Sequence, residues 1–245
     1  MPAFLENIAP FLGTGKDNEQ GQSLEEFLKE YDPYKYKNPC VTTDAVVFSY
    51  ERKPVKESNW KILMIQRGNH PCIGWWALPG GFINLNENLD DTAKRELEEE
   101  TGVKGLPMEQ FAVYGNVDRD PRARVVTSAY MAIVDAANII VKAGDDAADA
   151  LWYEVFCRTE TVEEINEAEA GEKMTDSEED RMKCRIHHLE LYSRERDIRL
   201  TAKVEERFRE GLIREQKFRV LDSDMIACDH AAIIVQAWKL LKSRI

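Results

Sequence analysis

The stretch GFINLNENLDDTAKRELEEETGV, from Gly81 to Val103, decides the fold of this chain of 245 residues. It begins with a glycine-bearing turn, and residues 88–101 form a strongly helical segment. On a helical wheel with about 100° per residue, three carboxylates share one narrow face that adjoins the apolar face of the helix. They belong to Glu96, Glu99 and Glu100.

A solvated, glutamate-rich helix would explain Glu98, which falls on the opposite side of the wheel together with Lys94. It does not explain three carboxylates crowded beside the core, because like charges repel unless something neutralises them. A hard divalent cation such as Mg²⁺ does so with carboxylate, water and phosphate oxygens. Arg95 lies next to Glu99 on the wheel and could orient it by a charge-assisted hydrogen bond. The pattern therefore favours a metal site.

The spacing of this stretch matches the pattern GX5EX7REUXEEXGU at every fixed position, where U is an aliphatic residue. The matching residues are Gly81, Glu87, Arg95, Glu96, Leu97, Glu99, Glu100, Gly102 and Val103. This pattern is the Nudix box, and the chain therefore resembles the Nudix hydrolase superfamily.

The resemblance implies an α/β Nudix fold, a mixed β-sheet sandwiched between helices. It also implies that Glu96, Glu99 and Glu100 bind Mg²⁺ or Mn²⁺ on the pyrophosphate of a substrate. Glu87 would be an accessory ligand or a support, and Arg95 would orient the carboxylates. The general base stays open between Glu96 and a carboxylate outside the box.

Five further stretches resemble the ADP-ribose pyrophosphatase branch of this superfamily: Tyr31–Phe48, Gln66–Ile83, Asp118–Tyr130, Ala143–Val155 and Ala227–Leu241. The resemblance implies Mg²⁺-dependent hydrolysis of ADP-ribose to AMP and ribose 5-phosphate. NADH, a sugar nucleotide, a dinucleoside polyphosphate or an oxidised nucleotide are alternative substrates. The branch also includes transcriptional regulators that sense ADP-ribose-like ligands without needing catalysis. Those regulators continue into a winged helix-turn-helix, and we expect none after Ile245.

Several residues outside the box are candidates for substrate contacts. Arg67 ends a predicted strand and could meet a substrate phosphate, or it could be a surface arginine. Arg119, Arg122 and Arg124 cluster in a turn and could bind phosphate or a terminal ribose, or they could pair with Asp118 and Asp120. Trp75 and Trp76 are adjacent, so on a strand they face opposite ways; one belongs to the core and the other could stack on a base. The predicted substrate-binding set is Arg67, Gly80, Gly81, Trp76, Arg119 and Arg122.

The hydrophobic pattern predicts five strands around the box helix: Val41–Tyr50, Trp60–Gln66, Phe111–Asp118, Val125–Val134 and Leu151–Cys157. A short helix follows Ser23, whose partner Glu26 would complete a capping box. A hairpin is expected over residues 185–207, and Asp229 would cap a final helix.

These elements divide the chain into a lead-in at residues 1–37 and a Nudix domain at 38–245. We expect an insertion at about 158–220, whose acidic stretch 159–180 would be a solvated helix or a loop. The insertion could be a dimer element, since many members of the branch are homodimers. It could also be a lid that supplies a catalytic carboxylate from Glu163, Glu164 or Glu167.

Lysine and arginine number 33 against 45 acidic residues, a net charge of −12. Such a chain is repelled by nucleic acid, although residues 181–219 hold 12 basic and 7 acidic residues. The five cysteines include no CxxC motif, which favours a reducing, cytoplasmic location. We expect no signal peptide and no membrane partner, because no apolar run approaches the length of a membrane span.

Overall fold

The computed structural model describes residues 4–51, 59–135, 139, 141–144, 147–164, 182–210, 212 and 215–245. It divides into two compact units, Met1–Pro39 and Cys40–Ile245. The first unit contains a 3₁₀ turn, η1 (Ala9–Phe11), and the helix α1 (Leu24–Glu30). The Ser23 hydroxyl accepts from the Glu26 backbone N–H, and the Glu26 carboxylate accepts from the Ser23 N–H, so the predicted capping box is confirmed.

The second unit is built on one mixed sheet. Its described strands are β1 (Cys40–Tyr50), β2 (Lys61–Arg67), β3 (Trp76–Ala77), β4 (Glu109–Tyr114), β5 (Val125–Asp135), β6 (Ala147–Glu164), β7 (Lys183–Ser193), β8 (Ile198–Arg209) and β9 (Glu215–Asp224). The order across the sheet is β4-β5-β1-β2-β6-β7-β8-β9, and β3 pairs with β2. β1 runs parallel to β5 and antiparallel to β2, as a mixed α/β fold requires.

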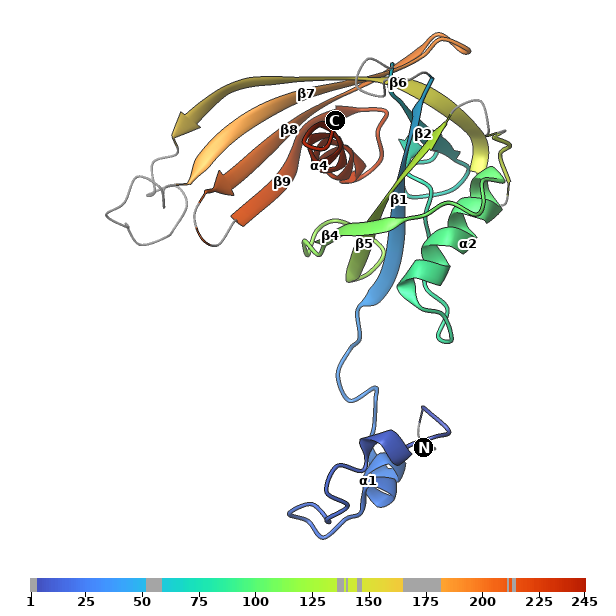
Figure 1. Ribbon diagram of the computed structural model, residues 1–245, viewed down its shortest axis with the longest axis vertical. Coiled ribbons are helices and arrows are strands. Elements are labelled where there is room, and N and C mark those ends of the chain that lie inside the picture. Colours follow the sequence, from blue (N-terminus) through green and yellow to red (C-terminus); the bar gives the residue numbers. More distant parts are fainter. Residues whose placement is uncertain are drawn as a thin grey trace. The chain divides into compact units, whose positions relative to one another are not determined.

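Helices cover both faces of the central strand β1, which explains why its residues 42–49 are all buried. Val46 and Phe48 pack in the cluster that includes the helix α4 (His230–Lys242). The alternate residues Ala45 and Val47 pack with Leu97 of the helix α2 (Leu89–Thr101). Figure 1 shows the sheet curling around α4 while α2 lies by its other face. The predicted sheet between helices is confirmed.

The region expected as an insertion continues the sheet. β6 extends to Glu164, so the prediction of a solvated helix or loop from residue 159 was wrong at its start. Polar side chains are tolerated there because the strand pairs with β7 through its backbone. The β7–β8 hairpin confirms the one expected over 185–207, while β9 was not anticipated. Residues 165–181 and the side chains of Glu163, Glu164 and Glu167 lie outside the described part of the chain.

Three other boundaries refine the predictions. β4 ends at Tyr114 rather than Asp118, because the chain turns there toward β5. α2 ends at Gly102, whose φ of 71° lies in the left-handed region. Asp229 occupies the N-cap position of α4 but its side chain makes no cap bond, since it binds Arg119 instead. Among the described helices, none has the length and apolarity to cross a membrane.

Candidate active site

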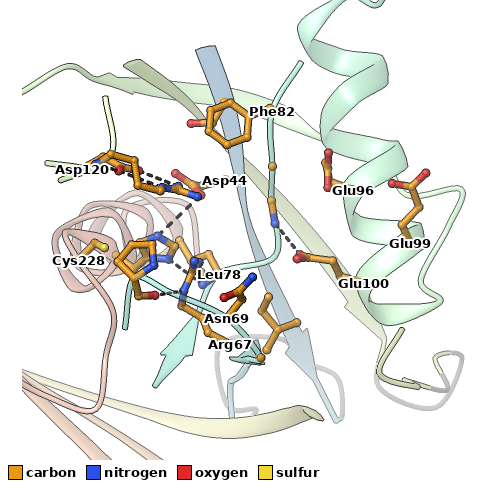
Figure 2. Close-up of a pocket in the computed structure, with 18 of the residues that line it drawn as sticks. Asp44, Arg67, Asn69, Leu78, Phe82, Glu96, Glu99, Glu100, Asp120 and Cys228 are labelled. Carbon is orange, nitrogen blue, oxygen red and sulfur yellow. Dashed lines mark hydrogen bonds and ion pairs between the residues drawn. The ribbon is translucent and has the colours of Figure 1, made fainter. Parts of the chain in front are cut away.

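A cavity of about 370 Å³ opens between α2, the ends of β1 and β2, and the corner that leads into α4. Figure 2 shows carboxylates projecting into it from α2 on one side and Asp44, Asp120 and Cys228 on the other. The lining includes Thr42, Asp44, Arg67, Asn69, His70, Gly80, Gly81, Phe82, Arg95, Glu96, Glu99, Glu100, Arg119, Asp120, Arg122, Cys228 and His230. The sequence-predicted carboxylate face of α2 therefore forms one wall of a cavity.

The glycines before α2 let the chain pass very close to this wall. Backbone pairing with β1 fixes them, since Thr43 donates to the Gly81 carbonyl at 2.9 Å. A Cβ on Gly81 would lie about 2.5 Å from the Glu96 carboxylate, and one on Gly80 would lie 2.0 Å from the Thr43 carbonyl oxygen. A side chain at position 80 would collide with the backbone of β1, so this position requires glycine, whereas a side chain at position 81 would push the Glu96 carboxylate aside.

Glu100 is the most buried of the three carboxylates, with 7% of its surface exposed. It accepts a hydrogen bond from the Gly80 N–H at 2.8 Å. Burial raises the pKa of Glu100 to about 8, and the nearby negative charges of Glu96 and Asp44 add to this effect. A carboxylate held in this way gains from a cation that binds beside it.

Arg95 ties the carboxylates together. Its Nε and Nη2 donate to the two carboxylate oxygens of Glu87 at 2.7 and 3.0 Å. Its Nη1 donates to Glu96 and Glu99 at 2.7 and 2.8 Å. The hydrogen bonds from Arg95 lower the pKa of Glu87 to about 2. Glu87 does not line the cavity, so its place is that of a support for Arg95 rather than of a group facing a substrate.

The opposite wall holds a second network of charged side chains. Arg119 donates to both oxygens of Asp229 at 2.9 Å, and its Nη2 lies 3.5 Å from Asp44. Burial opposes the charge of Arg119, but these carboxylates outweigh burial and raise its pKa. His230 accepts from the Leu78 N–H at 2.8 Å through Nδ1, and its Nε2 lies 3.9 Å from Asp44.

Two further arginines line the rim. Arg122 donates to Asp120 at 2.8 and 3.1 Å and lies over the Phe82 ring, 5.3 Å from its centroid. Its hydrogen bonds lower the pKa of Asp120. Arg67 donates from Nε to the Pro71 carbonyl at 2.6 Å and has no carboxylate ion-pair partner among the described residues.

The charges of the lining nearly cancel. Four arginines face five carboxylates, and three of the arginines are paired: Arg95 with Glu87, Glu96 and Glu99, Arg119 with Asp229 and Asp44, and Arg122 with Asp120. An anionic ligand would therefore find little positive charge from the protein alone.

The carboxylates suit a hard divalent cation in their chemistry. No group of three acidic, histidine or cysteine side chains converges as a ready-made metal cage within the described residues. Mg²⁺ needs no such cage, because one or two carboxylates with water and substrate oxygens satisfy it. The open, oxygen-rich face formed by Glu96, Glu99 and Glu100 fits that mode of binding.

Of the site residues predicted from the sequence, all except Glu87 and Trp76 line the cavity. Trp76 has 1% exposure, packs its ring against Tyr153 and does not line the cavity, so the prediction that it binds substrate was wrong. Its neighbour Trp75 is the exposed member of the pair. Glu98 lies away from the site and pairs with Lys104, not with Lys94 as the wheel suggested.

Sequence reasoning missed Asp44, Asp120, Phe82 and Asn69, all of which line the cavity. The sequence could have indicated Asp44, because a single carboxylate within the mostly apolar strand β1 is unusual and marks a candidate functional residue. The others depend on loops that meet only in the folded chain.

Comparison with known proteins agrees with the fold. The family described as NUDIX domain matches residues 28–179, more than half of the chain. The chain belongs to the Nudix domain family. A solved MutT/nudix family protein from Enterococcus faecalis is similar over 92% of this chain and 71% of its own, with 30% identity and a TM-score of 0.61.

Two relatives differ in their described roles. The ADPR responsive transcriptional repressor NtrR of Acinetobacter baylyi is 41% identical over 115 residues, which are 46% of this chain and 44% of the repressor. The ADP-ribose pyrophosphatase of Methanocaldococcus jannaschii is 35% identical over 131 residues, or 52% of this chain and 71% of that enzyme. The chain thus spans less than half of the length of the first relative.

Proposed function

We propose that this protein hydrolyses the pyrophosphate bond of a nucleoside diphosphate derivative, with ADP-ribose as the first candidate and Mg²⁺ or Mn²⁺ as cofactor. The products from ADP-ribose would be AMP and ribose 5-phosphate. The observation that carries the proposal is the set of three carboxylates on one wall of the cavity with a fourth, Asp44, opposite. The similarity to an archaeal ADP-ribose pyrophosphatase supports the choice of substrate.

Each side chain has a task that follows from its contacts. Glu96, Glu99 and Glu100 would hold the divalent cation, which when bound neutralises pyrophosphate charge and acidifies a water. Arg95 orients Glu96 and Glu99, because its Nη1 donates to both carboxylates and offsets their mutual repulsion. Arg67, whose charge has no carboxylate ion-pair partner in the described part of the chain, would bind a phosphate oxygen. Glu96 and Asp44 are the candidates to accept the proton of the attacking water.

The rim would hold the rest of the substrate. Phe82 is 43% exposed, with Arg122 over its ring, so an aromatic surface stands at the cavity mouth for a base or a ribose. Arg119 is paired with Asp229 and Asp44, so we assign it to shaping the wall rather than to binding phosphate.

The test is turnover of ADP-ribose, NADH, UDP-glucose, diadenosine polyphosphate and oxidised dGTP side by side, with about 5 mM Mg²⁺, enough for a weak carboxylate site. Product analysis by chromatography identifies the bond that breaks. A parallel series with chelator and with Mn²⁺ tests the metal. Preference for ADP-ribose that is lost with chelator supports the proposal. Preference for another substrate keeps the chemistry and rejects ADP-ribose.

A second candidate function is ADP-ribose sensing without catalysis, which the similarity to the Acinetobacter repressor favours. Calorimetry of ADP-ribose binding separates the two functions. Tight binding with no turnover of any substrate, with or without metal, would establish the sensor and reject the hydrolase. A homodimer, a cytoplasmic location and the absence of a nucleic-acid partner remain predictions from the sequence.

A further inference from the structure

Two cysteines that play no part in the proposed hydrolysis meet beside the cavity. The Sγ atoms of Cys72 and Cys228 lie 3.9 Å apart, although 156 positions separate them in the sequence. Both thiols are free and half-buried. Cys228 lines the cavity wall opposite α2, where Figure 2 labels it. Two sulfurs at this separation are in van der Waals contact.

Backbone hydrogen bonds hold the two segments in this position. Trp76 donates to the Met225 carbonyl and Ala227 donates to the Trp76 carbonyl, both at 2.8 Å. The loop that carries Cys72 is closed by the bond from the Arg67 N–H to the Trp75 carbonyl, also 2.8 Å. The cysteines therefore lie in turns beside two segments that backbone hydrogen bonds already join, and both pack at one small apolar cluster. Their contact follows from the fold rather than from the chance position of two side chains.

We propose that Cys72 and Cys228 form a reversible disulfide when a peroxide or a similar two-electron oxidant reaches the cavity. One sulfur attacks the O–O bond as a thiolate, which gives a sulfenic acid and releases one water after proton transfer. The second sulfur then attacks the sulfenic sulfur, the S–O bond breaks, and a second water leaves. In sum, two thiols and one hydrogen peroxide give one disulfide and two waters. A thiol reductant reverses the change.

The surroundings suggest the order of events. Burial raises the pKa of Cys228 to about 12, and the neighbouring Cys72 contributes to the rise. Cys228 therefore keeps its proton, and Cys72 is the sulfur that we expect to meet the oxidant first.

Closure of the disulfide would reshape one side of the cavity. A bond of about 2.05 Å requires the sulfurs to approach by nearly 2 Å. Cys228 precedes Asp229, which holds Arg119. Cys72 follows Pro71, whose carbonyl accepts from Arg67. We therefore expect oxidation to change ligand affinity through these two arginines more than it changes the carboxylate wall on α2.

The test is mass spectrometry of the full chain treated with dilute hydrogen peroxide. We expect a loss of about 2 Da, two hydrogen atoms, and a non-reduced digest with a peptide linking Cys72 to Cys228. Dithiothreitol should restore the original mass. Cys72→Ser should abolish the loss. Cys40→Ser, which removes an exposed thiol, is the matched control and should retain it.

Melting temperature gives an independent readout, because a cross-link across so long a loop should raise the Tm of the oxidised chain by several degrees. The proposal is wrong if the linked peptide is absent while either cysteine is over-oxidised, or if the mass loss persists in Cys72→Ser. None of these measurements depends on turnover, so the proposed hydrolysis and the disulfide can fail separately.

Discussion

Glu100 on α2 and Glu206 on β8 are both buried, with 7% and 0% of their surfaces exposed, yet their environments have opposite effects. Burial raises the pKa of Glu100 to about 8, and only one hydrogen bond, from the Gly80 N–H, and the nearby charge of Arg67 oppose this effect. Burial would also raise the pKa of Glu206, but hydrogen bonds from His187, Lys239 and Gln216 together lower it to about 2.

The difference lies in the number of compensating donors and not in the depth of burial. Glu206 receives donors from β7, β9 and α4, so its charge joins three elements of the fold. Glu100 faces a cavity beside other carboxylates, and the charge of Arg67 does not offset the cost of its burial. A fully compensated buried carboxylate indicates a structural role, whereas an under-compensated one marks a site.

The largest expected effect comes from breaking the compensated cluster. Glu206→Ala leaves Lys239 and His187 without their shared acceptor, and we expect a loss of about 3–5 kcal/mol in the free energy of unfolding. Urea denaturation measures it. Glu190→Gln, which removes an exposed glutamate paired with Arg199, is the control and should cost less than about 1 kcal/mol. Equal losses for the two variants would contradict the comparison.

The next effect concerns the under-compensated wall. Glu99→Gln should lower kcat by about 100-fold or more with little change in Tm, since it removes a central charge-stabilising group. Glu98→Gln has the same change one position away, on the face that pairs with Lys104, and should barely alter kcat. Steady-state kinetics on both variants measures these effects. A large loss of kcat in Glu98→Gln would contradict the assignment of Glu96, Glu99 and Glu100 to the functional face of α2.

The comparison of compensated with under-compensated charges also applies to the arginines of the cavity. Arg67 has no carboxylate ion-pair partner in the described structure, whereas Arg122 is held by Asp120. Arg67→Ala should therefore raise KM about tenfold through loss of a charge-assisted hydrogen bond to phosphate. Arg122→Ala should raise it only a few-fold. KM values for ADP-ribose test the order, and a reversed order would show that pairing does not decide which arginine binds phosphate.

The last prediction is a dependence of stability on pH. The pKa of Glu206 is lower in the folded state, about 2, than its ordinary value of 4.5. Its contribution is therefore complete above about pH 4.5 and is lost as the pH falls toward 2. Thermal melts between these values should show a steeper loss of Tm in the wild type than in Glu206→Gln. Parallel curves for the two proteins would contradict this assignment.

The central sheet and α2 could be predicted from the sequence because their signals are local. β1 and β5 are β-branched runs, and the wheel placed the carboxylates of α2 beside the core as the structure has them. The hairpin of β7 and β8 followed from strict alternation, and the buried His187 and Leu189 confirm it.

The rest depends on tertiary contacts. β9 has the sequence EQKFRVLDSD and buries only Phe218 fully, so it lacks the alternation of apolar residues that predicts a strand. Its backbone pairing with β8 stabilises it instead. Because Trp75 and Trp76 are adjacent, the sequence predicts that one of them is buried but not which one. The pairing of β3 with β2 buries Trp76. Asp44, Asp229 and Arg119 come from three separate segments, and nothing in their spacing predicts that they meet.

The length of β6, which is one continuous strand from Ala147 to Glu164, has a consequence for how the protein unfolds. Its first half pairs with β2 in the half of the sheet that carries the cavity, and its second half pairs with β7. No loop separates the two halves, so there is no hinge at which β7, β8 and β9 could detach while the remainder stays folded. The sheet should therefore exchange its amide hydrogens as one cooperative unit, and a deletion begun near residue 158 would cut a continuous ladder rather than trim an appendage.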